Sequence, residues 1–589
     1  MRSEVSQLPP SGFASCSYGC KGDHDQSPIV FLMTIHDFRN LEPGTALDAD
    51  LCIVGSGPAG WTIAEELRGT GVSVLVLESG GVLESGVHDR EADLEELNEI
   101  DDVGVPLFNT GRRRTLGGTP ESIPWGGRCI AFDPIDYRAR PWVPWSGWPI
   151  GEHEVTPYLD RASRHLGAGP YLPGGPVPCG VAKPAVDPDK LSNVCWAFGR
   201  DPDGETLRYG RLFRQRRHPN IRVLVHATVT HLNTNTVGNR IESVEIGHSD
   251  RQRATVTARA VVLCTGGLEN PRLLLASNRV APGGLGNAND LVGRFLMDHP
   301  RDLNMAVTLH RRHAPVLRRL FGPYLSGNGE ERRQFAGGFA LSESIQQGEE
   351  LLNAAAWPVE QVSEQDDPFF AAQRMKRAGA VNVRDLRRIA ASPRLFLHSV
   401  GTWARRDRPF RYKVDGIGFF IASEQRPDPD SRITLTDRLD RLGLPVLRTN
   451  WRISAQDRET QAVLAKVIAA EFRRLGLPEA RPADWVLHGR HEEARLSDGC
   501  HPTGTTRMSD DPGTGVVDPD GQVHGVDGLF IAGSSVFPTA GHANPTLMIV
   551  AMAVRLAEHL RTRLRANRGE PIGGRTVSDP ALVPLRAAS

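Results

Sequence analysis

Cysteine and net charge are both scarce in this sequence. Its eight cysteines are scattered over 589 residues, and Cys52 and Cys264 lie inside apolar strand-like segments, so no disulfide framework is predicted. Cys16 and Cys20 have no His or Cys partners at the spacing of a metal site, so we attribute their spacing to chance and predict no metal. Because 69 Lys and Arg balance 70 Asp and Glu, the overall charge offers no electrostatic case for binding nucleic acid.

Long apolar runs are also missing. No segment predicts a membrane-spanning helix, and residues 1–32 have neither the basic nor the apolar region of a secretory signal. We therefore expect a soluble, cytoplasmic protein. Residues 1–44 and 567–589 are expected to be tails, the first of them disordered or loosely ordered, and Met33 is a candidate for the true start because the chain runs straight from it into the first strand.

The segment "ADLCIVGSGPAGWTIAEELRGTGVSVLVLESGG" carries the clearest motif. An apolar strand leads into Gly55-x-Gly57-x-x-Gly60, a helix pattern follows, and a second apolar strand ends at Glu78. The three glycines suit a tight turn, a close approach to a pyrophosphate and close helix-to-strand packing, and Glu78 can accept hydrogen bonds from a ribose. The order of these parts predicts an α/β dinucleotide-binding unit, and this unit alone leaves NAD or FAD open.

Later segments return to the same fold. Short alternating strands are predicted from residues 220 to 260, followed by a buried strand over 261–264, and "GLFIAGSSVFP" supplies another strand that ends at Gly533. We therefore expect a discontinuous nucleotide-binding domain.

Three separated blocks resemble the glucose–methanol–choline (GMC) family of oxidoreductases. They are the glycine motif, "LGGTPESIPWGGRCIAFDPIDY" with "VPWSGWPI", and the carboxyl-terminal stretch from "CHPTGTTRM" to "AGHANPTLMIVAMAVRLAEHL". The resemblance continues through "TGGLENPRLLLAS", "GRFLMDHP" and "SEQRPDPDSRITL", and covers most of residues 45–565. The version here is closer to the bacterial branch near pyranose oxidases than to glucose or choline oxidases.

This resemblance implies FAD, bound in a Rossmann-like domain with which an α+β substrate domain carrying a mixed sheet is interleaved. The expected FAD-binding domain comprises residues 45–118, 222–300 and 495–566, and the expected substrate domain comprises residues 119–221 and 301–494. Candidate cofactor contacts are Gly55, Gly57, Pro58, Ala59, Gly60, Glu78, Ser79, Gly117, Gly118, Thr119, Trp125, Gly126, Gly127, Val229 near the adenine, Gly266, Gly533, Ser534, Asn544, Pro545 and Thr546.

One departure from the family pattern concerns how FAD is held. Relatives that attach flavin covalently have a histidine before the tryptophan of the second block, whereas Pro124 precedes Trp125 here. The stretch "TPESIP" around Glu121 is also longer than usual by about two residues, on the resemblance alone. We therefore predict non-covalent FAD.

His501 is the candidate base for oxidising an alcohol. An imidazole can take the hydroxyl proton at neutral pH while the C–H hydride goes to the flavin. The residue type alone favours a packed histidine whose ring nitrogens bond backbone in a Gly- and Pro-rich turn. The "HPTGTTRM" context resembles the catalytic-histidine block of the family and favours the base.

The sequence "GHANPT" contains two further candidates. Asn544 before Pro545 is a strong helix start, with Asn544 as N-cap and Pro545 as the first helical residue. The first-turn N–H groups of that helix would then face a reduced flavin, and the resemblance pairs Asn544 with His501 over the substrate oxygen. We give His542 an auxiliary role, and it becomes the base if His501 proves remote.

Residues 301–410 carry no readable chemistry. Basic residues outnumber acidic ones between Arg374 and Lys413, which we interpret as solvated helix faces, with a dock for an acceptor protein or a handle for an anionic substrate as the alternatives.

The leading hypothesis is FAD-dependent oxidation of a CH–OH group in a sugar, glycoside or related polyol. The alternatives are a lyase of the hydroxynitrile-lyase kind with redox-silent FAD, and a non-catalytic flavin-binding protein. The sequence leaves open whether oxygen, a quinone or a redox protein accepts the electrons.

Overall fold

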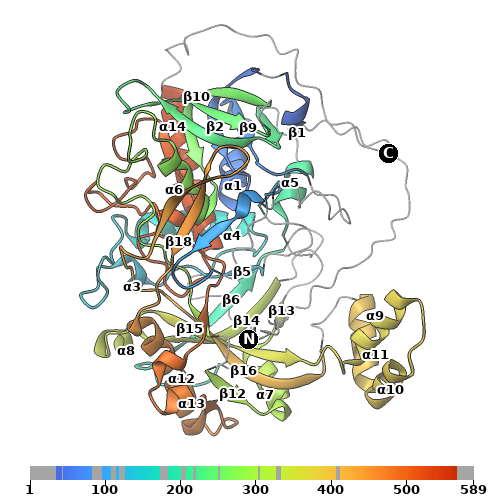
Figure 1. Ribbon diagram of the computed structural model, residues 1–589. Coiled ribbons are helices and arrows are strands. Elements are labelled where there is room, and N and C mark those ends of the chain that lie inside the picture. The colour runs from blue at the N-terminus through green and yellow to red at the C-terminus, as the bar shows by residue number, and fades with distance from the viewer. Residues whose placement is uncertain are drawn as a thin grey trace, which may run out of the picture.

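The computed structural model describes residues 35–42, 44–82, 94, 96–107, 114–118, 126–172, 183–200, 207–215, 220–249, 252–302, 306–326, 333–405 and 411–566. Two large sheets organise the chain, one in each half of the molecule (Figure 1). Within these ranges no helix combines the length and the apolar character that crossing a bilayer requires. The same ranges contain no cluster of three potential metal ligands.

The sheet in the upper half of Figure 1 has eight strands in the order β1-β7-β3-β2-β10-β9-β8, with β21 also paired to β10. The pairs from β1 to β10 and the β10–β21 pair are parallel, whereas β10–β9 and β9–β8 are antiparallel. The strands are Ile35–Asp37 (β1), Ala46–Val54 (β2), Val74–Leu77 (β3), Ile221–Val225 (β7), Thr228–Thr234 (β8), Ile241–Gly247 (β9), Arg253–Leu263 (β10) and Leu529–Ile531 (β21).

Distant parts of the chain meet in this sheet. Val54 at the end of β2 lies opposite Leu263 of β10, and Leu263 in turn lies opposite Ile531 of β21. Helix α14 (Thr546–Ala566) packs against α1 (Pro58–Glu66) and α4 (Glu152–His165). The predicted discontinuous Rossmann-like arrangement is confirmed.

The amino-terminal tail is shorter than expected. Residues 35–42 form β1 and a 3-10 helix (Phe38–Asn40) instead of belonging to a loosely ordered tail. Ile35 and Leu41 are buried and Phe38 is completely so, because β1 extends the eight-stranded sheet beyond β7. The prediction was wrong for these residues, since a strand of three residues with one apolar side chain, Ile35, gives little sequence signal. Residues 1–34 and 567–589 lie outside the described residues.

The lower sheet has ten strands, in the order β19-β12-β16-β15-β14-β6-β5 with β11, β13 and β20 attached. All of its described strand pairs are antiparallel. Parallel and antiparallel pairs occur together in the eight-stranded sheet and in the three-stranded sheet. The strands are Arg128–Cys129 (β5), Leu191–Phe198 (β6), Arg301–Asp302 (β11), Val307–Leu309 (β12), Tyr324–Ser326 (β13), Arg333–Leu341 (β14), Ala354–Val362 (β15), Val414–Ser423 (β16), Arg481–Pro482 (β19) and Leu496–Ser497 (β20).

The two faces of this sheet differ. Phe339 and Phe419 point to a face that is covered by α12 (Ala455–Arg474) and α7 (Ala314–Phe321), where they pack against Phe321 and Phe472. Their strand neighbours point the other way, as alternation along a strand requires. That second face carries a separate aromatic cluster that includes Trp196, Trp357 and Phe420.

A small sheet and several short helices complete the body. Strands β17 (Arg432–Leu439), β18 (Pro445–Asn450) and β4 (Ile100–Asp102) form a sheet in which β18 pairs antiparallel with β17 and parallel with β4. Helix α6 (Gly266–Ala276) packs against β17 and β8. The remaining short helices of the body are Pro134–Tyr137 (α3), Tyr209–Gln215 (α5), Glu343–Gly348 (α8), Asp484–Leu487 (α13), and 3-10 turns at Glu96–Asn98, Arg311–His313, His491–Glu493 and Ser534–Val536.

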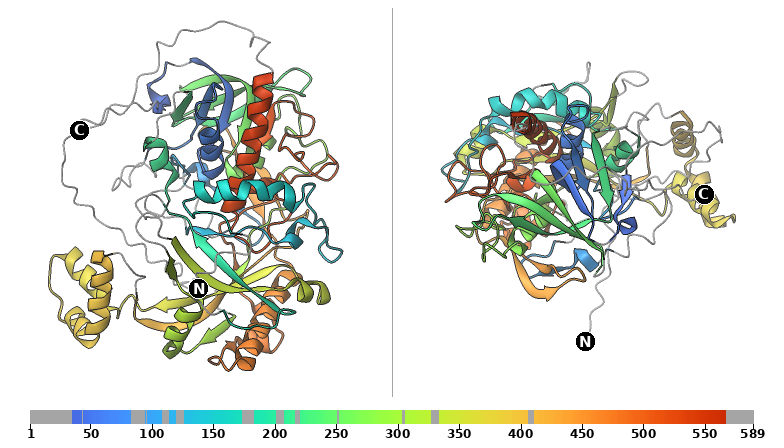
Figure 2. Two further views of the ribbon diagram at one scale, coloured as in Figure 1. Left: turned by 180° about the vertical axis from the view of Figure 1, so that it is seen from behind. Right: turned by 90° about the horizontal axis from the view of Figure 1, so that it is seen from above.

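Three helices project from the lower half between β15 and β16 (Figures 1 and 2). They are α9 (Pro368–Ala378), α10 (Val383–Ala391) and α11 (Pro393–Arg405), and they pack on one another. This projection contains most of the basic segment, where Arg374 and Arg388 both form ion pairs with Asp385. Part of the excess positive charge is thus compensated locally on solvated helix faces.

Candidate active site

The glycine loop has the backbone geometry that its motif predicts. Gly55 has a φ of +97°, and a Cβ at this position would lie 2.7 Å from the carbonyl oxygen of Cys264. A Cβ on Gly60 would lie 2.0 Å from the oxygen of Gly55, so only glycine lets α1 pack this closely. Among the residues that the structure describes, no atom lies within 4 Å of a Cβ built on Gly57. The loop before Pro58 and Ala59 therefore opens onto free space at the start of α1.

Glu78 faces this loop from the end of β3. Its carboxylate accepts hydrogen bonds from the N–H of Ser56 (3.2 Å) and the N–H of Gly80 (2.9 Å). Ser56 Oγ in turn accepts the N–H of Gly117 (2.8 Å), which brings the second block against the first. Burial raises the pKa of Glu78 although these hydrogen bonds oppose the shift. These contacts place the Glu78 carboxylate against the glycine loop.

Several other cofactor candidates lie beside this loop. A Cβ on Gly118 would be 3.2 Å from the Cα of Gly57. Ser79 Oγ lies 2.6 Å from the Oγ1 of Thr228, directly before Val229 on β8. Gly126 and Gly127 precede β5 in the lower sheet, whereas Thr119 and Trp125 lie outside the described residues, as do Glu121 and Pro124.

The carboxyl-terminal block joins the same region. A Cβ on Gly267, next to Gly266 at the start of α6, would lie 2.2 Å from the carbonyl oxygen of Pro502. Ser534, which follows Gly533, donates its hydroxyl to that same oxygen at 2.8 Å. The segment after His501 is thus packed against the strand end that supports Gly55.

His501 is held by a neighbouring segment, residues 297–299. The Asp298 carboxylate accepts the backbone N–H groups of Gly499 (2.6 Å), His299 (2.6 Å) and His501 (2.9 Å). The imidazole of His299 lies with its Nδ1 3.1 Å from Nδ1 of His501 and its Nε2 3.0 Å from the carbonyl oxygen of Gly541. His299 therefore connects His501 to the segment that carries His542 and Asn544.

The electrostatic surroundings keep both rings neutral. Burial lowers the pKa of His299 to about 4. Burial, followed by the positive charge of His299 when protonated and of Arg301, lowers the pKa of His501 well below its usual range. A neutral imidazole is the form that can accept a proton, so His501 is available as a base at neutral pH.

The helix after Asn544 begins later than predicted. We expected Asn544 at the N-cap and Pro545 as the first helical residue, but α14 begins at Thr546 and the first helical carbonyl, that of Pro545, accepts the N–H of Ile549 (2.8 Å). Pro545 thus occupies the capping position, because its carbonyl starts the hydrogen-bond ladder. The carboxamide of Asn544 makes no hydrogen bond within the described residues and is left available to a ligand.

His542 lies in a different environment from His501. Its Nε2 is 3.2 Å from the Oδ2 of Asp133. Burial alone would lower the pKa of His542, but the hydrogen bond to Asp133 and the charges of Asp133 and Asp136 outweigh it and raise the pKa. A histidine biased toward its protonated form is a poor base, so the raised pKa of His542 leaves His501 as the candidate for that role.

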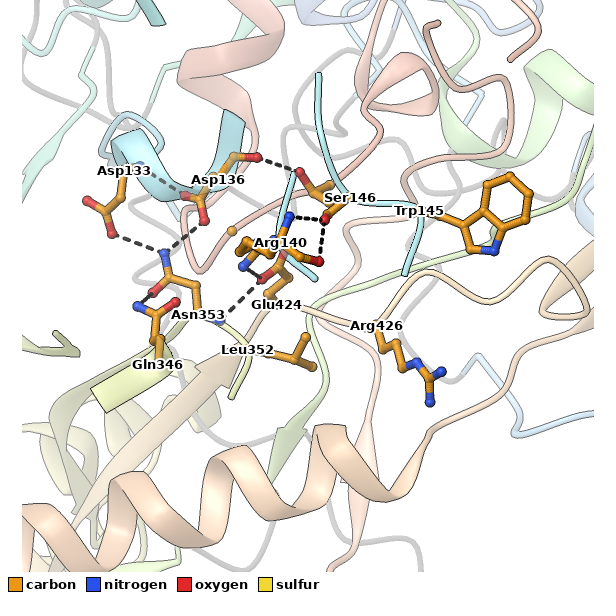
Figure 3. Close-up of polar contacts among 12 residues, drawn as sticks. Asp133, Asp136, Arg140, Trp145, Ser146, Gln346, Leu352, Asn353, Glu424 and Arg426 are labelled. Carbon is orange, nitrogen blue, oxygen red and sulfur yellow. Dashed lines mark hydrogen bonds and ion pairs between the residues drawn. The ribbon is translucent and has the colours of Figure 1, made fainter. Parts of the chain in front are cut away.

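A layer of hydrogen-bonded polar side chains, which includes Asp133, Asp136, Asn353 and the Arg140–Glu424 pair, lies next to this segment (Figure 3). Asn353 donates its amide to Asp133 (3.1 Å) and Asp136 (2.9 Å), while Arg140 forms a bidentate ion pair with Glu424 (2.6 and 2.8 Å). A Cβ on Gly541 would lie 2.2 Å from Asp136, so the loop rests directly on this carboxyl group.

Comparison with known proteins identifies the family. Residues 208–301 and 427–553 match the two models described as GMC oxidoreductase, and residues 53–114 match an NAD(P)-binding Rossmann-like domain. The chain is 24% identical to paromamine 6'-oxidase of Streptomyces fradiae, over 86% of this chain and 90% of that protein. It is 26% identical to a C-glycoside 3-oxidase of Microbacterium trichothecenolyticum, over 88% and 97%. The crystal structure of pyridoxine 4-oxidase from Mesorbium loti superposes with a TM-score of 0.52 at 18% identity, covering 87% of this chain and 99% of that one.

The chain belongs to the GMC oxidoreductase family. Its membership confirms the prediction of an oxidoreductase that acts on alcohol groups with FAD as cofactor. The residues present fit this GMC cofactor, because a Cβ on Gly57 would meet no described atom, the first turn of α1 has no side-chain cap, and the Glu78 carboxylate lies beside this loop. When bound, FAD would be held by these residues and would supply the hydride acceptor.

Three residues of this GMC chain were missed by the sequence reasoning. Asp298 and His299 lie in the "MDHP" stretch that was used only to recognise the family, and Asp133 lies in the "FDPIDY" stretch. The one sequence signal for His299 was that the "MDHP" stretch contains a histidine to which no role had been assigned. Nothing local indicated Asp133, because its partner His542 is hundreds of residues away.

Replacing Asp136 should change how stability depends on pH. Burial and the charges of Asp133 and Glu424 raise the pKa of Asp136 to about 7, from 3.8 for a free carboxyl group. Between these values the folded protein keeps a proton that the unfolded chain has lost, so this group makes stability fall as pH rises from about 4 to about 7. We expect Asp136→Asn to reduce the fall in melting temperature between pH 5 and pH 7.5, measured by differential scanning fluorimetry. Asp437→Asn, on an exposed aspartate, is the control and should leave the fall unchanged. Equal slopes in all three proteins would contradict the assignment.

Proposed function

We propose that this protein oxidises a CH–OH group of a sugar, glycoside or related polyol, with His501 as the base that takes the hydroxyl proton. The observation that carries the proposal is the position of His501. It is a neutral imidazole fixed through Asp298 and His299, and it is packed through Pro502 against the strand end that supports the glycine loop. A proton acceptor beside a flavin cleft is what alcohol oxidation requires.

Asn544 supports the same chemistry from the other side of His299. We propose that its free carboxamide donates a hydrogen bond to the substrate oxygen and that the first-turn N–H groups of α14, from Thr546 onward, stabilise negative charge nearby. His542, biased toward its cation by Asp133, adds positive charge to this segment and takes no part as the base.

The aromatic face of the lower sheet favours a sugar-like substrate. The Trp357 and Phe420 rings stack 4.8 Å apart, and Trp196 packs edge-on against Trp357 at 5.2 Å and against His542 at 6.4 Å. Trp196 is completely buried and Trp357 nearly so, which leaves Phe420 as the partly exposed ring of this platform. An apolar ring beside hydrogen-bonding groups suits a ligand that has C–H faces and hydroxyl edges. The name of the C-glycoside 3-oxidase relative agrees with this class of substrate.

Arg128 provides unused hydrogen-bond donors on this platform. Its guanidinium lies 4.5 Å from the Trp357 ring, 5.1 Å from Phe198 and 5.5 Å from Trp196, and its Nη1 has no partner among the described residues. Burial, with no compensating anion, lowers the pKa of Arg128 to about 9. An unpaired guanidinium in an aromatic cage is costly unless a ligand satisfies it. We propose that Arg128 donates to substrate hydroxyl oxygens remote from the reacting carbon.

The first test is flavin bleaching under anaerobic conditions. D-glucose, a C-glycoside, paromamine and 1,2-propanediol are mixed with the yellow holoenzyme, and at least one sugar or glycoside should bleach the flavin band near 450 nm. His501→Ala should slow that bleaching by about 10² to 10⁴ while FAD stays bound. Unchanged reduction kinetics in the variant would remove His501 from the mechanism, and no bleaching by any alcohol would favour a redox-silent role. Readmission of air then tells an oxidase from a dehydrogenase.

The cofactor should be released when the protein is denatured. Because Pro124 occupies the position of the attachment histidine, we propose that FAD is held without a covalent bond. Acid precipitation should leave about one FAD per chain in the clear supernatant, as measured by its absorbance and by mass spectrometry. A yellow pellet with a flavin-modified peptide would contradict this.

Substitution of Arg128 should weaken the binding of polyols selectively. Arg128→Met keeps the aliphatic contact with the rings but loses the donors, so the half-saturating concentration of an active sugar should rise about 10-fold or more. The limiting rate of flavin reduction should change little, and 1,2-propanediol, which has no remote hydroxyl groups, should be affected least. An equal loss on sugar and diol would argue against this role.

A further inference from the structure

His299 lies between the proposed base and the segment that leads to Asn544. Its ring is almost completely buried, and it stands nearly perpendicular to the His501 ring, with centroids 5.0 Å apart and planes at 84°. Its Nδ1 lies 3.1 Å from Nδ1 of His501, and its Nε2 lies 3.0 Å from the carbonyl oxygen of Gly541. These two contacts fix where the protons are.

The carbonyl group decides the tautomer of His299. A carbonyl oxygen can only accept, so Nε2 of His299 must carry the hydrogen that Gly541 accepts. A neutral imidazole has a single N–H, and therefore Nδ1 of His299 has a lone pair. The opposite tautomer would place two lone pairs 3.0 Å apart in a buried setting and lose a hydrogen bond.

The tautomer of His501 follows from that of His299. Because Nδ1 of His299 is an acceptor, the facing Nδ1 of His501 must be the donor of their shared hydrogen bond. The lone pair of neutral His501 is then on Nε2, which makes no hydrogen bond within the described residues. The nitrogen that is free to meet a substrate is thus also the basic one.

Burial protects this arrangement from protonation. A doubly protonated His299 would donate from Nδ1 and force His501 into the Nε2–H form, which has no lone pair for the substrate. The low pKa of His299 prevents this at neutral pH, although Glu424 opposes the shift while His542 supports it. Arg301 acts on His501 in the same direction, because its positive charge disfavours the imidazolium form.

Asp298 keeps the two rings in register. Its carboxylate holds the backbone N–H groups of His299 and His501 together, and residues 297 and 503 pair as a short antiparallel bridge. Cys500 lies between Gly499 and His501, whose N–H groups both donate to Asp298. It has a φ of +63°, which is uncommon for a residue other than glycine. The backbone is thus constrained on both sides of the ring-to-ring contact.

We propose that His299 is a positioning residue that selects the Nδ1–H tautomer of His501, so that Nε2 of His501 is the atom that takes the substrate proton. This inference rests on the proposed function in that it assigns the reacting nitrogen of the same base. His299 itself touches neither substrate nor flavin in this role. It acts only through the hydrogen bond to His501, which the carbonyl of Gly541 polarises.

Two variants separate this role from mere packing. In His299→Gln the side-chain amide can donate to Gly541 while its oxygen accepts from His501, whereas His299→Leu fills a similar volume without an acceptor. With the sugar that bleaches the flavin fastest among D-glucose, the C-glycoside and paromamine, His299→Leu should lower the limiting reduction rate about 10- to 100-fold, the factor one buried hydrogen bond is worth. The half-saturating concentration should stay within about twofold. His299→Gln should recover most of the rate, and equal rates for both variants would overturn the proposal.

A second measurement does not depend on any substrate. Holoenzyme labelled with ¹⁵N-histidine is compared with His501→Gln, so that the missing signals identify the His501 ring by NMR at pH 7. We expect a protonated Nδ1 and an unprotonated Nε2, and we expect His299→Leu, but not His299→Gln, to move this ring toward the Nε2–H form. A wild-type His501 with its proton on Nε2 would overturn the inference. If the tautomer is as expected but no alcohol reduces the flavin, the proposed function fails while the assignment of protons stands.

Discussion

The carboxylate of Asp298 is the contact on which the rest of the candidate site depends. It accepts three backbone N–H groups, from Gly499, His299 and His501, so one carboxylate satisfies donors from both segments. Burial and the nearby Asp498 raise the pKa of Asp298 to about 7 even though the N–H groups oppose the shift. The Asp298 side chain thus joins residues 298–299 to residues 499–501, at the start of the carboxyl-terminal block.

The site also depends on close approaches that only small residues permit. Gly55 rests on Cys264, Gly267 rests on Pro502, and Gly541 rests on Asp136, each with no room for a Cβ. These three contacts join the amino-terminal loop, the middle of the chain and the carboxyl-terminal block. Close to Gly541, the Arg140–Glu424 pair and Asn353 form a hydrogen-bonded polar layer, and these paired contacts hold its side chains in place (Figure 3).

The sequence predictions were correct where a feature depends on residues close together in the chain. The glycine loop and its strands were predictable because the turn at φ +97° and the close packing of α1 on the strand both require glycine. The spacing of those glycines is visible in the sequence. Residues 35–42 were misassigned because a three-residue edge strand carries too little periodicity. The roles of His299 and Asp133 were out of reach, since each depends on a partner supplied by a distant segment, and the start of α14 was missed by one residue because the proline took the capping position itself.

The opposite environments of two nearby histidines explain how one site can hold both a protonated and a neutral imidazole. His542 pairs with Asp133 and is biased toward the cation, whereas His501 faces a neutral histidine and Arg301 and is biased toward the free base. Environments that push two pKa values apart are how a protein assigns distinct acid–base roles to identical side chains. Had a carboxylate stood where His299 stands, it would have raised the pKa of His501 and favoured the imidazolium form. A neutral imidazole in that place accepts the same hydrogen bond without stabilising the charge, and so leaves His501 both oriented and ready to take a proton.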